Sequence, residues 1–175
     1  MPIERSLRPV AAASILTLAR RLLDASTLCA IATVAPGDRA HVNTAYFAWS
    51  RDLEIVWLSD PGARHSQNLR RNASVAIAVY DSTQTWGEPD RGIQLFGPAR
   101  EAMGRLTRAS GRIYAARFPE YEGPDSGGYV LYRLRPRRIK VFDERALGSG
   151  VFVTARVGAG GRVSWQRTEM YHADA

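Results

Sequence analysis

The segment EIVWLSDPGARHSQNLRRNASVAIAVY, residues 54–80, decides how this chain of 175 residues folds. Residues 54–59 and 74–80 are short apolar runs of the kind that form β-strands, and the second is too continuously apolar for an exposed edge strand. Between them the strand pattern breaks at Asp60, which can cap a helix, and Pro61, which suits a first helical position. We therefore predict a strand, a short helix over about 61–71 and a second strand.

Further strands and helices are predicted on both sides of this segment. Upstream, residues 27–34 and 41–49 predict two strands, preceded by an amphipathic helix over about 10–25 with Ile15, Leu18 and Leu22 at helical spacing. Downstream we expect a strand over 91–99 that Gly97 and Pro98 interrupt, and a helix over 101–118. Strands over 129–135 and 137–142 and a hairpin over about 151–167 complete the pattern.

These elements predict a single domain spanning residues 1–175, mainly β (α+β). It has about eight short antiparallel strands, closed into a barrel, and two or three flanking helices. A doubly wound parallel sheet is disfavoured, because most gaps between strands are too short for parallel crossovers.

The charge balance is basic, with 24 Lys and Arg against 17 Asp and Glu and a net charge of +7. The excess gathers in the C-terminal part, especially between Arg133 and the sole lysine, Lys140, where cations partly alternate with apolar residues. This alternation predicts strands with one solvated, charged face, and the alternative is a stripe that binds polyanions. Because no DNA- or RNA-binding motif accompanies the stripe, we expect no nucleic-acid partner.

Several classes of protein and site are excluded. No apolar run reaches the roughly 20 residues that cross a bilayer, so we expect no membrane association. The single cysteine, Cys29, cannot form an internal disulfide and is expected to fill the core. His41, His65 and His172 show no metal-ligand spacing with it, so no metal is expected. Without a secretory signal we expect a cytoplasmic protein.

A candidate anion site lies at the start of the predicted short helix. Residues 61–64 place the Arg64 cation and free backbone N–H groups at a helix start, and Ser59 adds a hydroxyl just before the turn. The backbone near Thr44 and Ala45 could meet the hydrogen-bonding edge of a planar heterocycle. The alternative interpretation is that Arg64 is a surface charge.

Three blocks together resemble the pyridoxamine 5'-phosphate oxidase-like family of flavin-binding split β-barrels. They are LCAIATVAPGDRAHVNTAYFAW (28–49), LEIVWLSDPGARHSQNLRRNASVAIAVYD (53–81) and GIQLFGPARE (92–101). Their order and spacing match over roughly residues 20–120. The later segment YVLYRLRPRRIKVFDE (129–144) resembles the closing strands of the same barrel.

The resemblance implies a homodimer that binds FMN in two clefts at the subunit interface. The phosphate would be held by Arg64 and His65, with Ser59 as a hydroxyl contact, and Asn68 could face the same pocket. The ring would lie along residues 43–48, with Gln94, or Gly92 in a shifted register, near the ring. The cofactor residues implied are Asn43, Thr44, Ala45, Tyr46, Phe47, Leu58, Ser59, Arg64, His65, Asn68 and Gln94.

The chain departs from the family pattern at several of these positions. His65 stands where the family usually has a phosphate lysine, Asn43 where it has an arginine, and Phe142 is nearest to the tryptophan beside the flavin. We therefore expect an FMN-dependent oxidoreductase whose small-molecule substrate is not a B6 vitamer, with no catalytic residue assigned. The alternatives are a deazaflavin coenzyme or haem on the same fold, or a flavin-binding protein without catalysis.

The substrate side is expected near the predicted helix over 101–118. Tyr114, Arg117 and Tyr121 lie on or after this helix, although packing of the helix explains Tyr114 equally well.

Overall fold

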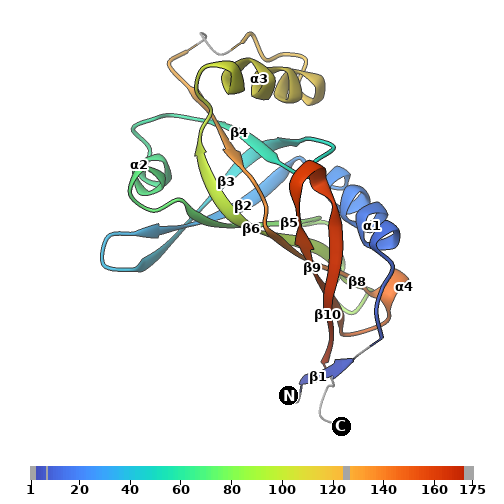
Figure 1. The fold of residues 1–175 in the computed structure, drawn as a ribbon. Helices are drawn as coiled ribbons and strands as arrows, with labels where there is room; N and C mark the ends of the chain where they lie inside the picture. Colours follow the sequence, from blue (N-terminus) through green and yellow to red (C-terminus); the bar gives the residue numbers. More distant parts are fainter. Residues whose placement is uncertain (1–2, 7, 124–126, 172–175) are drawn as a thin grey trace.

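The computed structural model describes residues 3–6, 8–123 and 127–171, in which ten strands and four α-helices are found (Figure 1). The strands are β1 (Ile3–Ser6), β2 (Leu28–Ala35), β3 (Arg39–Trp49), β4 (Ile55–Ser59), β5 (Ser74–Tyr80), β6 (Arg91–Glu101), β7 (Val130–Leu134), β8 (Arg138–Asp143), β9 (Val151–Val157) and β10 (Val163–Tyr171). The helices are α1 (Ala12–Asp24), α2 (Arg64–Arg71), α3 (Arg105–Arg117) and α4 (Glu144–Leu147), with a 3₁₀ turn at Ala159–Gly161.

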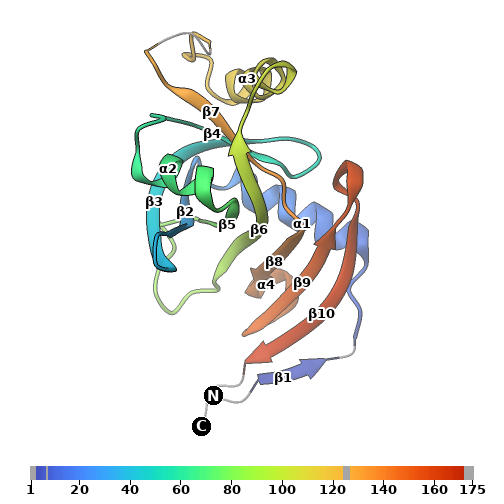
Figure 2. The same ribbon diagram turned by 60° about the vertical axis from the view of Figure 1, so that its left-hand side comes forward.

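Six strands close a barrel in the order β6-β5-β2-β3-β4-β7, with β7 pairing back onto β6. The remaining strands continue the sheet from β6 in the order β8-β9-β10-β1, and Figure 2 shows this extension leaving the barrel. All strand pairings in the described residues are antiparallel. The predicted mainly-β antiparallel barrel with flanking helices is thereby confirmed.

Strand β6 belongs to both parts of the sheet. Its first half pairs with β8, up to Phe96, and its second half pairs with β7 from Ala99 onward. The expectation that Gly97 and Pro98 interrupt the strand is wrong. Pro98 has no N–H to donate, but its carbonyl accepts from Arg135 N at 3.0 Å, and Gly97 leaves room for the carbonyl of Arg135.

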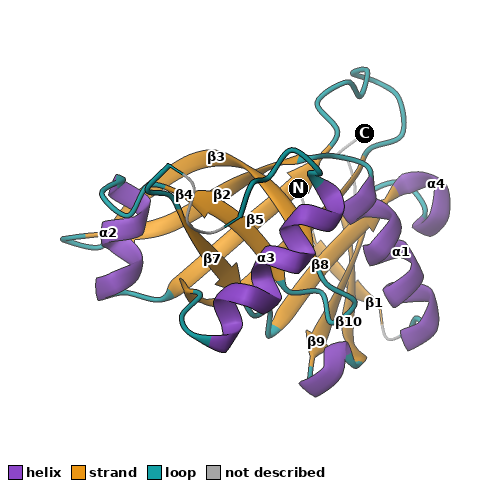
Figure 3. Ribbon diagram, turned by 90° about the horizontal axis from the view of Figure 1, so that it is seen from above, coloured by secondary structure: helices purple, strands orange, loops and turns teal. Residues whose placement is uncertain are grey.

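The helices lie on the outside of the strands (Figure 3). The apolar stripe of α1, which includes Ile15, Leu22 and Leu23, is buried in the core against β5, β6, β8 and β10. Helix α3 contacts β3, β4 and β7, where Tyr114 joins a smaller apolar cluster with Leu131. These two helices therefore cover different parts of the barrel wall.

Helix α2 begins later than predicted. Its N-cap is Ala63, and no side chain caps it. Asp60 does not act as the cap, because its Oδ1 accepts from the backbone N–H of Gly62 at 2.6 Å and is used within the preceding turn. This leaves the first turn of α2 without a carboxylate acceptor.

Two elements were not predicted, β1 and α4. Each has only four residues, too few for a clear pattern in the sequence. Strand β1 pairs with β10, and α4 is capped by Asp143, whose Oδ1 accepts from Ala146 N at 3.1 Å. Asp143 also accepts a hydrogen bond from Arg21 of α1 at 2.7 Å, which ties α4 to that helix.

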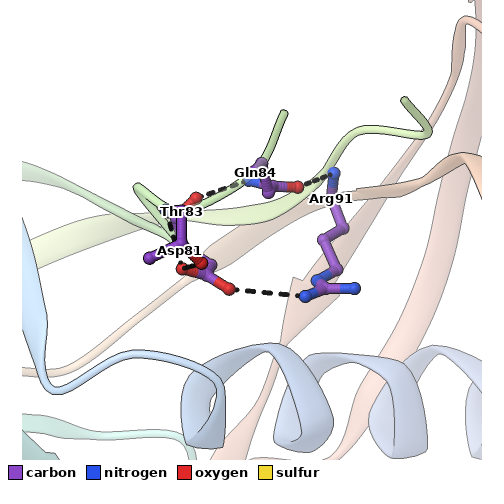
Figure 4. A network of polar contacts seen from close by, with 4 residues as sticks. All are labelled: Asp81, Thr83, Gln84 and Arg91. Atoms are coloured by element: carbon purple, nitrogen blue, oxygen red, sulfur yellow. Dashed lines mark hydrogen bonds and ion pairs between the residues drawn. The ribbon is translucent and has the colours of Figure 1, made fainter. Parts of the chain in front are cut away.

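The loop between β5 and β6 is held by its own polar contacts (Figure 4). The backbone N–H and the hydroxyl of Thr83 donate to Asp81 Oδ1 at 2.9 and 2.7 Å, and the Arg91 guanidinium lies 3.4 Å from Asp81 Oδ2. The backbone N–H of Arg91 donates to Gln84 Oε1 at 2.7 Å. The Thr83 hydrogen bonds, followed by Arg91, lower the pKa of Asp81, so the carboxylate that closes the loop stays ionised.

Candidate functional site

A cavity of about 280 Å³ is lined by residues from β3, β4, α2 and α3. Seven of the predicted cofactor residues line it, namely Asn43, Thr44, Ala45, Tyr46, Leu58, Ser59 and His65. Tyr114 and Tyr129 complete the wall. The fold therefore brings β3, the end of β4 and the start of α2 together around one cavity.

A serine–histidine pair forms the polar end of this cavity. Ser59 is the last residue of β4, and its Oγ is hydrogen-bonded to Nε2 of His65, 2.7 Å away, in the first turn of α2. His65 is only 8% exposed. Burial, with a smaller contribution from His41, lowers the pKa of His65 below its ordinary 6.5, so the imidazole is neutral at pH 7.

The beginning of α2 is suited to an anion. Its first N–H groups have no side-chain cap, and they carry the positive end of the helix dipole. Arg64, the first helical residue, is exposed and makes no hydrogen bond or ion pair with another described residue. The Asp60 carboxylate, in the preceding turn, is the opposing charge.

Asn43 lines the cavity and carries one hydrogen-bonding atom that is not used. Its Oδ1 is buried and finds no partner among the described residues, while its Nδ2 donates a long hydrogen bond to the Thr44 carbonyl at 3.4 Å. A buried acceptor without a donor is costly, and a ligand N–H would satisfy it. On the neighbouring strand, Cys29 donates to the Ala45 carbonyl, and burial raises the pKa of this thiol to about 12, so it is unreactive.

Four of the predicted residues do not line the cavity. Phe47 is fully buried in the core, Arg64 lies outside the lining, and Asn68 is buried and donates to Thr33 Oγ1 at 3.0 Å. Gln94 lies on β6, opposite Ala78 of β5, so β5 and β2 separate it from β3. Strand alternation accounts for Phe47, because its side chain points to the face opposite to that of Tyr46.

A second cavity of about 510 Å³ adjoins the first and shares Tyr46, Leu58, Tyr114 and Tyr129 with it. Tyr121 lines it, whereas Arg117 points elsewhere and donates to the carbonyls of Leu23 and Ser26. Burial, then the neighbouring Tyr121, raises the pKa of Tyr114, which keeps its hydroxyl protonated. Tyr129 was not predicted as a site residue, because the sequence shows it only as an aromatic residue at the start of a predicted strand.

Three of the five cations in the stripe at residues 133–140 are engaged within the chain. Arg133 forms an ion pair with Glu54, and the Arg138 guanidinium lies 4.5 Å from the centre of the Phe96 ring. Lys140 Nζ is 3.5 Å from a carboxylate oxygen of Glu169. Cations with such partners have less charge to offer a polyanion, which favours the prediction of a solvated strand face.

The described residues contain no group of three or more His, Cys, Asp or Glu side chains that could hold a metal ion. His172 lies outside the described residues. None of the helices in the described part of the chain is long and apolar enough to span a bilayer.

A family model described as "Pyridoxamine 5'-phosphate oxidase" matches residues 16–143. Among curated proteins no sequence matches the chain. Solved structures that resemble it include a putative pyridoxamine 5'-phosphate oxidase from Listeria innocua, with a TM-score of 0.60 and 18% sequence identity over 73% of this chain and 98% of that one.

Two further similar structures carry the names of bound groups. An FAD-binding protein from Mesorhizobium loti has a TM-score of 0.55 and 19% identity over 79% of this chain and 96% of that one. A haem-binding protein from Mycobacterium smegmatis has a TM-score of 0.60 and 17% identity over 92% of this chain. This chain spans 59% of the length of the haem-binding protein and 58% of the length of another matching structure. At this level of sequence identity, the likeness shows a shared fold and nothing more.

Proposed function

The chain belongs to the pyridoxamine 5'-phosphate oxidase family, and on this premise we propose that it binds FMN and acts as a flavin-dependent oxidoreductase on a small molecule other than a B6 vitamer. The observation that carries the proposal is the gathering of seven residues from β3, β4 and α2 around one cavity beside an uncapped helix start. A planar ring with a phosphate tail needs this combination of backbone edge and anion site.

The residues present fit the ring of such a cofactor. Asn43 Oδ1 is a buried acceptor with no partner among the described residues, and a ring N–H would satisfy it. Thr44 and Ala45 follow on the same strand, and Leu58 adds apolar surface. FMN supplies hydride transfer when bound, and the work of the chain is to hold and orient it and to exclude water.

The residues present also fit the phosphate. Ser59 can donate its hydroxyl, the first N–H groups of α2 are uncapped, and the Arg64 guanidinium is free to turn toward an anion at the same helix start. His65 is neutral at pH 7 and contributes a hydrogen bond rather than a charge. Phosphate binding therefore depends mainly on Arg64 and the helix start.

We further propose that the working form is a homodimer. The outer face of β2, β5 and β6 carries half-buried alanines such as Ala30 and Ala78, flanked by exposed Val42 (66%) and Tyr80 (52%). Exposed apolar surface of this kind on a sheet is typical of an interface. Gln94 lies on this face, paired with Ala78, so its side chain would contact a second copy of the chain. The cavity of its own chain lies on β3, beyond β5 and β2.

The test is to purify the chain and identify what it carries by absorbance and mass, then to titrate the ligand-free protein with FMN. The proposal expects a flavin spectrum, or quenching of flavin fluorescence on titration, followed by reduction with a nicotinamide donor. No FMN binding would refute it. Tighter binding of a deazaflavin coenzyme, or a Soret band from haem, would change the cofactor; bound flavin that no donor reduces would indicate a binding protein without catalysis.

A further inference from the structure

The second cavity, of about 510 Å³, has a distinctive wall. Tyr46, Tyr114, Phe118, Tyr121 and Tyr129 supply aromatic surface on several sides. The ring of Phe118 lies 4.8 Å from that of Tyr114 and 5.9 Å from that of Tyr46, and Tyr114 lies 5.2 Å from Tyr121 edge-on. The rings of Tyr46, Phe118, Tyr114 and Tyr121 therefore form a connected cluster, and Tyr129 lines the same hollow.

Part of this aromatic surface faces solvent. Tyr46 is 58% exposed and Tyr129 is 49% exposed, although both are large apolar side chains. Exposed aromatic surface that lines a hollow is typical of an interaction site, and the volume is in the range of small-molecule sites. Because Tyr46, Leu58, Tyr114 and Tyr129 also line the proposed cofactor cavity, a ligand here would lie beside the cofactor.

The charges around this cavity have one sign. Among the described residues that line it, the only charged side chains are Glu120 and Glu122, both exposed at the rim. Arg117, the last residue of α3, does not line the cavity and is held by the carbonyls of Leu23 and Ser26. Tyr114 keeps its proton, so the wall itself is neutral. None of the cavity-lining residues that the structure describes carries a positive charge that could compensate a phosphate or carboxylate.

We propose that this cavity is the substrate pocket and that it selects flat organic cations, such as quaternary or protonated aromatic amines, over anionic and neutral molecules of the same shape. Aromatic faces attract a cation through their quadrupoles, and the two rim carboxylates add attraction of the same sign. The inference rests on the proposed function for the identity of the neighbouring cofactor, but the charge preference of the pocket does not depend on that cofactor.

The experiment measures the binding of three probes of similar shape to the full chain, with and without FMN. They are phenyltrimethylammonium, its neutral isostere tert-butylbenzene, and the anion benzenesulfonate, each followed by ligand-observed NMR. The proposal expects the cation to bind at least about fivefold more tightly than either other probe, as one or two cation–π contacts would provide. Equal binding of the neutral probe, or tighter binding of the anion, would overturn it.

Variants locate the site. Tyr129→Leu should weaken cation binding about fivefold or more, whereas Trp86→Leu, which removes an exposed aromatic ring in the β5–β6 loop outside the cavity, should leave it unchanged. Glu122→Gln should weaken binding of the cation more than Glu88→Gln, a substitution in the distant β5–β6 loop. If Tyr129→Leu and Trp86→Leu behave alike, the pocket assignment is wrong.

The two proposals fail separately. FMN binding without any preference for the cation overturns the substrate class and leaves the cofactor assignment intact. Cation preference in protein that does not bind FMN overturns the cofactor assignment and supports the charge selectivity of the pocket.

Discussion

At the scale of single residues, His65 shows how burial changes the use of a basic side chain. The position is 8% exposed, and Nε2 is hydrogen-bonded to Ser59 Oγ at 2.7 Å. A lysine there would bring a full charge to the cavity, whereas this histidine is neutral at pH 7 because its pKa is lowered. The candidate site therefore relies on hydrogen bonds where a more basic site would use charge.

This lowered pKa predicts a pH dependence of stability. Between the folded-state pKa and 6.5, the unfolded chain binds more protons than the folded chain, so the free energy of unfolding falls as pH drops through that window. Thermal unfolding should show a lower Tm at pH 5.5 than at pH 7.5, and the difference should shrink in His65→Gln. The carboxylates of Asp81 and Glu144, whose pKa values are also lowered, affect the free energy of unfolding only near and below pH 4.5, which is outside this window. An unchanged pH dependence in His65→Gln would contradict this prediction.

At the scale of elements, Arg117 joins α3 to the end of α1. Its Nη2 donates to the carbonyls of Leu23 at 3.1 Å and Ser26 at 2.7 Å, and its guanidinium lies 4.7 Å from the centre of the Phe47 ring. Arg117→Leu should lower the free energy of unfolding by about 2–3 kcal/mol, because half-buried carbonyls lose a charged donor. Urea unfolding measures this, with Arg112→Leu, exposed on the same helix, as the matched control. Equal effects of the two substitutions would be evidence against the link.

The passage of β6 from the extension into the barrel depends on Gly97. A Cβ at this position would collide with the carbonyl of Arg135, a backbone atom that cannot turn aside. Gly97→Ala should therefore cost about 3 kcal/mol or more in unfolding free energy. Gly158→Ala, where a Cβ would meet the Arg162 carbonyl at an ordinary 3.7 Å, serves as the control. Similar urea midpoints for the two variants would show that the crossing tolerates a side chain.

Features that follow from the local sequence pattern can be predicted from the sequence, whereas features that depend on tertiary contacts cannot. The apolar run at 74–80 predicts β5 with its observed bounds, because strand formation there follows from the residues themselves. The break at Gly97 was predicted wrongly, because the partner that uses the glycine, Arg135, is distant in sequence. The anion site at Ser59 and Arg64 was predicted from the residues themselves, and His65 was added through family resemblance. Tyr129 and the acidic rim of the second cavity emerge only from the fold.

At the scale of the whole molecule, the outer sheet face predicts self-association. Light scattering should give a particle of twice the mass of one chain. Ala78→Arg, placed on β5 among half-buried alanines, should yield a folded monomer, because a buried charge without a partner opposes association. Arg71→Ala, at the exposed end of α2, should remain dimeric. A wild-type chain that is monomeric at high concentration would exclude the dimer.

The central claim, that the start of α2 holds the phosphate of FMN, is tested most directly by comparing FMN with riboflavin, which lacks that phosphate. Fluorescence titration should show FMN binding at least about tenfold more tightly than riboflavin, as a charge-assisted contact provides. Arg64→Ala should remove most of that preference, and Arg71→Ala, at the other end of the helix, should keep it. Equal affinity for FMN and riboflavin in the wild-type chain, or no binding of either, would contradict the account.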